Sequence, residues 1–334
     1  MGWLRPIERR GAANPLPASY NDHRMNLLQT SPGTRVEAPA ARKPSGRRQR
    51  TLAKAAEVLG TGMITGSKIR LRLLPAAPDS GVAFFRTDIP NPSPIPARAE
   101  SVTGTARRTT LGTGANQVTL VEHVLAALAG MRVDNCLVEL NGPEPPGLDG
   151  SSEGYVDTLL AAGTILQPSR RPRLAVSEPV SVSQNGATLS IYPREGDDLL
   201  ISYLLDYGPY SPIAPQSLTL CINPDRFRRD LARCRTYVLE HEALELQRQG
   251  IGRHLKPSEI LVFGPKGLIE NKLRFSDEPA RHKILDLVGD LALCGFDLVG
   301  HVVAYRSGHP LNVELARALT RVAQSAHRES ARRG

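Results

Sequence analysis

A short stretch near residue 280 carries three side chains that could bind a metal ion or transfer a proton. His282, Asp286 and Asp290 are each four residues apart, so on an α-helix they stand in one column. An imidazole and a carboxylate one turn apart can bind the same ion, and zinc accepts such nitrogen and oxygen ligands. The alternative interpretation is the solvated polar face of an ordinary helix.

A second candidate is the adjacent pair Glu122 and His123, which opens an apolar stretch. A metallohydrolase can use such a pair, with the histidine as a metal ligand and the glutamate as the base that takes a proton from metal-bound water. Thr119 and Glu122 also fit a Ser/Thr-x-x-Glu capping box, which by itself explains the glutamate. The sequence leaves both interpretations open.

A third candidate is His309, which follows a Ser-Gly turn and precedes Pro310 at the expected start of a helix. A histidine at such a turn is well positioned for acid or base catalysis. The N-terminus of a helix disfavours a charged imidazole, and pairing with Asp290 would offset this effect. A surface histidine without a role is the alternative.

Periodic patterns predict the elements that must hold these residues. Apolar and charged residues alternate over residues 69–73 as in a strand with one solvated face. Further expected elements are a strand at 82–85, a helix at 119–130, a strand at 136–140 and a helix at 155–162. The second half repeats this order, with strands near 174–176, 187–191, 199–205 and 298–305. Aligning Gly130 with Gly295 matches 137–140 with 302–305, which suggests an internal duplication.

The length of 334 residues suits two domains. We expect a disordered basic extension at 1–50, a first domain at 51–166, a linker, and a second domain at 174–325. The Arg-rich, acid-poor composition of the extension also fits an organelle transit peptide, or a start codon assigned too early, with Met25 as an alternative start.

The formal net charge of +9 is concentrated in the first 50 residues, which hold ten basic and three acidic side chains. The remaining chain is nearly balanced, so we expect no nucleic-acid partner. The four cysteines are far apart and form no Cys-x-x-Cys pair, which is typical of buried thiols in a reducing cytoplasm. Because no run of about 18 apolar residues occurs, we predict a soluble cytoplasmic protein.

Together these segments resemble one family, the UDP-3-O-acyl-N-acetylglucosamine deacetylases (LpxC). The resemblance covers about residues 50–321. It depends on several motifs that occur in the family's order and approximate spacing: Val121-Glu122-His123, Asp134-Asn135, Leu148-Asp149-Gly150-Ser151, Arg235-Thr236, Leu273-Arg274-Phe275, His282-Lys283-Ile284-Leu285-Asp286 and Ser307-Gly308-His309.

The resemblance implies hydrolysis of the N-acetyl group of UDP-3-O-acyl-N-acetylglucosamine, which releases acetate at an early committed step of lipid A synthesis. It implies one Zn²⁺ per chain, bound by His123, His282 and Asp286, with a fourth position for water. The implied partner is therefore a small UDP-sugar with an acyl chain. Since that substrate is amphiphilic, we expect transient contact with a membrane surface, and we expect a monomer.

The same resemblance assigns the remaining catalytic roles. Glu122 would be the general base, and the Thr236 hydroxyl would help zinc to polarise the acetyl carbonyl. His309 would protonate the departing amine. Asp290 would orient His309 and keep it cationic, and Lys283 would contact the substrate near the reacting centre.

The implied fold is α+β: two similar domains, each a β-sheet with two helices, with the helices sandwiched between the sheets and the zinc at the domain junction. An insert at residues 246–263 would form the passage for the acyl chain. The chain departs from the family at three positions. Residues 252–257 replace a Gly-rich stretch, Ile64 stands near a usual histidine, and Arg306 replaces a usual lysine.

Two alternative functions stay open. One is a non-catalytic homologue that binds a nucleotide sugar or an acyl chain, which the altered insert and Ile64 motivate. The other is a related zinc deacetylase that acts on a different acylated amide. The intact set of three expected ligands favours a working enzyme over the first alternative.

Overall fold

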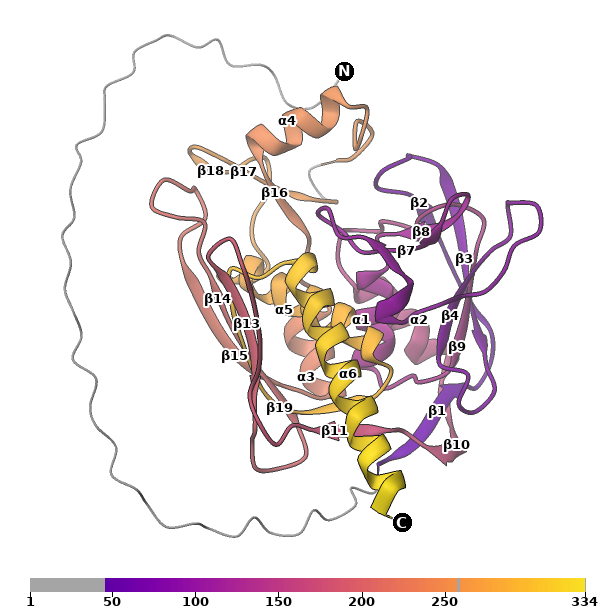
Figure 1. Ribbon diagram of the computed structural model, residues 1–334. Coiled ribbons are helices and arrows are strands. Elements are labelled where there is room, and N and C mark those ends of the chain that lie inside the picture. The colour runs from indigo at the N-terminus through magenta and orange to yellow at the C-terminus, as the bar shows by residue number, and fades with distance from the viewer. Residues whose placement is uncertain (1–45, 257–258, 334) are drawn as a thin grey trace, which may run out of the picture.

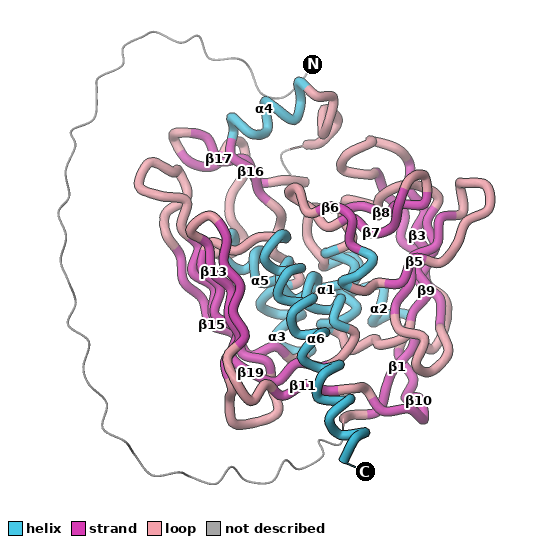
Figure 2. Tube along the Cα trace, in the orientation of Figure 1, coloured by secondary structure: helices cyan, strands magenta, loops and turns pink. Residues whose placement is uncertain are grey.

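Two large β-sheets lie on either side of a layer of helices (Figures 1 and 2). This computed structural model describes residues 46–256 and 259–333. The arrangement confirms the expected α+β class, with helices between sheets. Each sheet buries one face against the helices, as layered architectures require.

The first large sheet has five strands in the order β2-β3-β9-β4-β5. The predicted alternation in β3 is observed, because Ile69, Leu71 and Leu73 are buried whereas Arg70 is exposed. The strands are β2 (Ala56–Thr61), β3 (Lys68–Pro75), β4 (Val82–Arg86), β5 (Ile95–Pro96) and β9 (Cys136–Leu140).

The second large sheet repeats this topology with the order β12-β13-β19-β14-β15, and β11 adds to β19. In both sheets the central strand, β9 or β19, pairs antiparallel on one side and parallel on the other. The duplication inferred from the sequence is therefore present in the fold. The strands are β11 (Arg173–Ala175), β12 (Val180–Gln184), β13 (Ala187–Tyr192), β14 (Leu199–Leu205), β15 (Gln216–Ile222) and β19 (Asp297–Tyr305).

Four helices between the sheets follow the same repeat: α1 (Glu122–Gly130), α2 (Glu153–Ala162), α5 (Glu278–Leu291) and α6 (His309–Arg333). In each half one helix precedes the central strand and one follows it. α1 and α5 pack closely, since a Cβ atom on Gly289 would lie 2.1 Å from the carbonyl oxygen of Glu122. A glycine at this position therefore lets the start of α1 approach α5.

Smaller elements cover the edges of the helical layer. In Figure 1, α4 and the strands beside it form a separate lobe at the top. The described residues of the insert expected at 246–263 belong to this lobe, which begins earlier, at β16. The elements are β6 (Val102–Gly104), β7 (Thr110–Thr113), β8 (Asn116–Thr119), α3 (Pro224–Arg226), β16 (Tyr237–Leu239), α4 (Glu240–Arg248), β17 (Leu261–Gly264), β18 (Gly267–Leu268), the 3-10 turns Ala99–Ser101 and Ala292–Cys294, and a π-helical turn Phe227–Leu231.

The expected extension and linker differ from the structure at their boundaries. β1 (Arg48–Leu52) pairs antiparallel with β10 (Thr164–Arg170), so the fold already includes residues within the expected extension. The cause is a charged junction: the Arg47 guanidinium lies 2.7 Å from both carboxylate oxygens of Asp134 and 3.1 Å from Asp297 Oδ1. Residues 1–45 of the extension lie outside the described residues.

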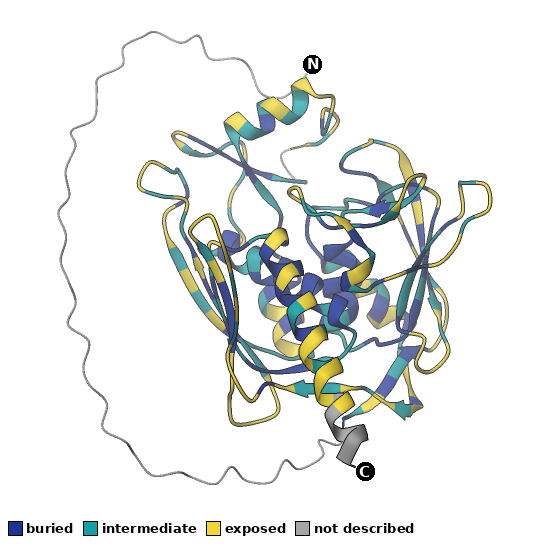
Figure 3. Cartoon of the chain, in the orientation of Figure 1, coloured by how far each residue is buried: buried dark blue, intermediate teal, exposed yellow. Residues whose placement is uncertain are grey.

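The hydrophobic core is continuous between the two halves. One cluster joins inner strands of both sheets with α1, α2, α5 and α6. Figure 3 shows buried positions on the central helices and along the strands of both sheets. The domain boundaries expected at 51–166 and 174–325 stay a prediction. Within the described residues, no helix combines the length and apolarity needed to cross a membrane.

Candidate metal centre and active site

Three side chains from α1 and α5 converge at the junction between the two halves. Their ligating atoms, from His123, His282 and Asp286, lie within 4.8 Å of one another, and all three residues are buried. The Oδ1 atom of Asp286 lies 3.7 Å from His123 Nε2 and 3.3 Å from His282 Nε2. Ligands held tetrahedrally at about 2.1 Å from one ion are roughly 3.4 Å apart. The spacing therefore fits a single ion.

The tautomer of the His282 ring also suits metal binding. Its Nδ1 atom lies 3.0 Å from the carbonyl oxygen of Cys234. Because that oxygen can only accept, Nδ1 carries the proton and Nε2 presents its lone pair toward Asp286. Burial lowers the pKa of His282, which favours the neutral imidazole that metal binding needs.

Asp286 is held ionised by its neighbours. Burial would raise its pKa, but His282 and the ammonium group of Lys283 outweigh burial and hold the pKa well below the usual value. Lys283 Nζ donates to Asp286 Oδ2 at 2.7 Å. Burial opposes the charge of Lys283 as well, yet the Asp286 carboxylate raises the lysine pKa above its ordinary value. The contact of Lys283 in the structure is thus with Asp286, a member of the candidate metal cluster.

The capping-box explanation of Glu122 is wrong. α1 begins after Val121, which makes no side-chain cap, and Thr119 lies in β8, where its hydroxyl bonds to that of Thr110. Leu120 adopts a φ of 58°, which separates the strand from the helix. The Glu122 carboxylate instead accepts a hydrogen bond from the backbone N–H of Thr109. It is therefore directed into the site beside His123.

His309 and Asp290 form a buried pair on the other side of the cluster. His309 Nδ1 lies 2.8 Å from Asp290 Oδ2, and Asn312 donates to the same oxygen at 2.9 Å. Thr109 donates its hydroxyl to Asp290 Oδ1 at 2.6 Å. The free Nε2 atom of His309 faces Glu122 Oε1 at 3.9 Å. An oriented imidazole and a carboxylate thus flank the metal cluster.

The pKa values of His309 and Glu122 are both raised, but for different reasons. Burial lowers the pKa of His309, but Asp290 and Glu122 outweigh it and raise the pKa to about 9. Burial raises the pKa of Glu122, although His309 and His123 oppose the shift. A histidine that stays protonated can serve as an acid, and a glutamate with a raised pKa is a stronger base.

Thr236 lies in the wall of a cavity of about 140 Å³ next to the cluster. The ring of the adjacent Tyr237 packs edge-on against His282 with centroids 6.2 Å apart. The rest of the lining is largely apolar and comes from both halves, including Ile64, Leu246 and Leu255. The structure therefore brings an apolar cavity to the side of the candidate metal centre.

Comparison with known proteins agrees with this geometry. The family profile described as UDP-3-O-acyl N-acetylglycosamine deacetylase (LpxC) matches residues 49–321. The chain belongs to the LpxC family. UDP-3-O-acyl-N-acetylglucosamine deacetylases from Myxococcus xanthus and Chlamydia caviae are 38% and 39% identical to it. These alignments cover 82% and 83% of this chain, and 87% and 99% of the relatives.

Residues at the three departures from the LpxC pattern make local contacts. His254 Nε2 lies 2.8 Å from the carbonyl oxygen of Gly62 and so ties the insert to the first half. Ile64 lines the apolar cavity, and its N–H donates to the buried carboxylate of Glu144. Arg306 pairs with Asp206 at 2.6 Å. None of these residues belongs to the candidate metal cluster.

Sequence reasoning missed three groups that organise this LpxC site. Thr109 bonds to both Glu122 and Asp290, and the Cys234 carbonyl fixes the His282 tautomer. Thr109 stands in an unpatterned Arg-Arg-Thr-Thr stretch, and a backbone carbonyl has no sequence signal. Asn312, at the third residue after His309, could have been found by its spacing on the helix that His309 begins.

Proposed function

We propose that this chain is a zinc-dependent deacetylase that hydrolyses the N-acetyl group of UDP-3-O-acyl-N-acetylglucosamine and releases acetate, an early step of lipid A synthesis. The observation that carries the proposal is the buried cluster of His123, His282 and Asp286, flanked by Glu122 and His309. Membership of the family and the names of its relatives support the substrate.

Zinc is the metal that we propose for the cluster, because two imidazole nitrogens and one carboxylate oxygen leave a position for water, as in catalytic zinc sites. When bound, zinc lowers the pKa of its water toward about 7 and polarises a carbonyl group. His123, His282 and Asp286 would hold it. Lys283 offsets the charge of Asp286 at 2.7 Å and is the group that we expect to meet the substrate.

Two proton transfers follow from the remaining residues. Glu122 takes a proton from the attacking water, and His309 donates the proton on Nε2 to the departing amine, which is a poor leaving group without it. Asp290 holds His309 Nδ1 at 2.8 Å and stabilises its cationic form. We propose that the Thr236 hydroxyl donates to the developing oxyanion.

The apolar cavity beside Thr236 supports an acylated substrate. A cavity of about 150 Å³ accommodates benzene, so this one of about 140 Å³ can receive only part of a long acyl chain. The remainder would extend past the insert. We propose on this basis that the acyl end of the substrate leaves the protein near α4, where brief contact with a membrane surface is expected. We propose a cytoplasmic monomer, and the free thiols of Cys136, Cys221, Cys234 and Cys294 support a reducing compartment.

The deciding assay incubates the zinc-loaded chain with UDP-3-O-acyl-N-acetylglucosamine and measures acetate and the free amine. We expect both products in equal amounts, and little turnover of the same UDP-sugar without its 3-O-acyl chain, because the apolar cavity is then empty. Binding without product would indicate a non-catalytic homologue. Turnover confined to another acylated amide would indicate a different substrate.

The variant Asp290→Asn tests the role of the His309 pair through pH. The acid must be protonated, so activity falls as pH rises through the pKa of His309. Removing the carboxylate removes the main attraction that raises this pKa. The alkaline limb of the kcat profile is therefore expected to move to lower pH by about one to three units.

Asp157→Asn is the matched control, because Asp157 is exposed on α2. Both variants and the parent are compared with the same metal bound, so the difference reports Asp290 alone. An unchanged alkaline limb in Asp290→Asn would show that His309 is not the acid whose charge Asp290 sustains.

A further inference from the structure

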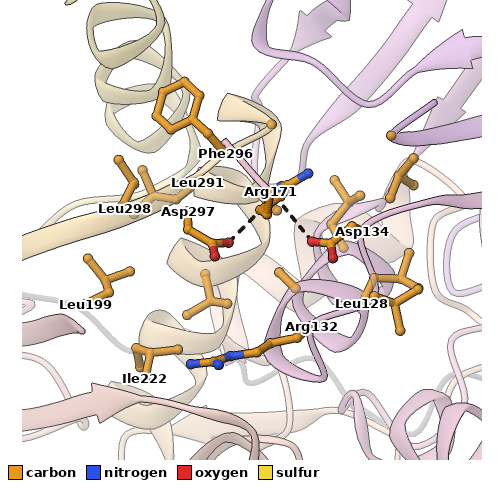
Figure 4. Close-up of a pocket in the computed structure, with 18 of the residues that line it drawn as sticks. Leu128, Arg132, Asp134, Arg171, Leu199, Ile222, Leu291, Phe296, Asp297 and Leu298 are labelled. Carbon is orange, nitrogen blue, oxygen red and sulfur yellow. Dashed lines mark ion pairs between the residues drawn. The ribbon is translucent and has the colours of Figure 1, made fainter. Parts of the chain in front are cut away.

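A second cavity of about 140 Å³ lies between the two halves of the chain, near the charged junction at β1 and β11. Figure 4 shows its two sides: Leu128 and Asp134 belong to the first half, and Leu199, Ile222 and Leu298 to the second. It shares no lining residue with the cavity beside Thr236. The proposed deacetylation does not use it.

The cavity contacts the faces of α1 and α5 that point away from the metal cluster. On α1 its lining residues are Leu125, Leu128 and Ala129, which are two, five and six positions after His123. The α5 side repeats this spacing after Asp286, with lining residues at positions 288, 291 and 292. At 3.6 residues per turn these positions lie on the opposite side of each helix from the ligand. The floor of the cavity is thus apolar and separate from the catalytic groups.

Two arginines at the cavity are already neutralised. Arg171 lies between Asp134 and Asp297, as Figure 4 shows, with its Nε atom 3.3 Å and 3.6 Å from their carboxylate oxygens. Arg47 contacts the same two carboxylates. These two cations and two anions balance. At the rim, Asp197 and Asp198 are exposed, and Asp197 pairs with Arg173.

Two further arginines, Arg132 and Arg98, line the cavity, and their guanidinium groups have no carboxylate or carbonyl partner among the described residues. In Figure 4 the Arg132 side chain reaches from the first half across the cavity toward Ile222. Both residues are half-buried, and their guanidinium groups keep contact with solvent. Two guanidinium groups without a carboxylate partner at one cavity are therefore available to bind an anion.

The backbone at Arg132 supports a role beyond structure. The N–H of Arg132 bonds to the carbonyl of Ala129, and that of Val133 bonds to the carbonyl of Leu128. These bonds form a Schellman motif, whose left-handed residue is usually glycine. Arg132 occupies it with a φ of 56°. A non-glycine residue costs about 1 kcal/mol there, so the fold accepts strain to place this side chain.

The corresponding helix end in the second half also has a left-handed residue, but there it is a glycine. After α5 the left-handed position is Gly295, with a φ of 76°. A Cβ atom there would lie 1.1 Å from Nη1 of Arg98. The glycine therefore leaves room for the Arg98 guanidinium. The end of α1 thus places the Arg132 guanidinium at the cavity, and the end of α5 leaves space there for the Arg98 guanidinium.

We propose that this cavity binds a small amphiphilic anion, with a carboxylate or phosphate head group on Arg98 and Arg132 and an apolar part against α1 and α5. Guanidinium groups bind both kinds of head group in a bidentate manner. The volume limits the apolar part to about the size of benzene. Because its walls include the backs of α1 and α5, the ligand would contact the two helices that carry the metal cluster.

The test titrates the full zinc-loaded chain with hexanoate, hexyl phosphate and 1-hexanol by calorimetry. At least one of the two anions is expected to bind saturably at one site, and the neutral alcohol about tenfold more weakly or worse. The better anion identifies the head group. Arg132→Gly and Arg98→Gln are each expected to weaken that binding about tenfold or more, whereas Arg132→Lys keeps the charge and most of the affinity.

Arg132→Gly separates ligand binding from folding. Glycine is the preferred residue in the Schellman turn, so the melting temperature of this variant should equal or exceed that of the parent. Arg108→Gln is the matched control, because Arg108 lines the other cavity. Equal binding of hexanol, unaltered binding by Arg132→Gly, no saturable binding by the parent, or loss only in Arg108→Gln would each overturn the proposal.

Discussion

Replacing His123 by alanine is expected to remove the bound metal and to reduce turnover below detection. The variant leaves two of the three proposed ligands, His282 and Asp286, whereas a catalytic zinc site uses three. The parent protein, purified without chelator, should contain about one zinc per chain. Elemental analysis of both proteins measures the metal, and the acetate-release assay measures turnover.

The matched control for this loss is His241→Ala, because His241 is an exposed histidine on α4 outside the cluster. It should keep metal and activity at parent levels. Since an ion that binds only the folded state stabilises it, a chelator should lower the melting temperature of the parent and of His241→Ala, but not that of His123→Ala. Full zinc content in His123→Ala would refute the assignment of this ligand.

Two of the three candidate metal ligands could be predicted from the sequence because helix geometry is regular. His282 and Asp286 are one turn apart, so their convergence follows from the period of the helix. The position of His123 beside them does not follow from helix periodicity, because it depends on how closely α1 packs against α5. Gly289 permits that approach, but an isolated glycine in a helix pattern does not indicate which segment will pack on it. The family resemblance supplied this pairing.

The role of Glu122 could not be settled by local pattern. Thr119 and Glu122 have the spacing of a capping box, and the rule failed because the left-handed Leu120 ends β8 before α1 begins. Boundaries set by tertiary contacts lie outside what local spacing can predict. The same reason explains the extension, where Arg47 is drawn into the fold by Asp134 and Asp297, each far from it in the sequence.

The internal duplication was predicted from a weak match and has a structural meaning. Aligning Gly130 with Gly295 correctly related α1 and β9 to α5 and β19. The two halves nevertheless contribute unequally to the site: α1 supplies Glu122 and His123 from its first turn, whereas α5 supplies its groups along its length. The repeat therefore accounts for the scaffold, whereas the candidate catalytic residues differ between its two copies.

Glu122→Gln is expected to keep the metal and to lower kcat by about 10²–10⁴-fold, the usual contribution of a general base. Glutamine preserves the shape of the side chain and can still accept the hydrogen bond from the Thr109 N–H, so the start of α1 should stay in place. It cannot take a proton from water. Turnover and zinc content measured on the same preparation separate loss of the base from loss of the site.

The removal of charge from Glu122 also affects His309, whose pKa Glu122 helps to raise. The residual activity of Glu122→Gln should therefore lose its acid limb, which reports the base, and its alkaline limb should move to lower pH. Glu195→Gln, at an exposed glutamate, controls for the charge change and should match the parent. If Glu122→Gln retained zinc and full turnover, another group would have to accept the proton. The carboxylate would then serve only to anchor Thr109.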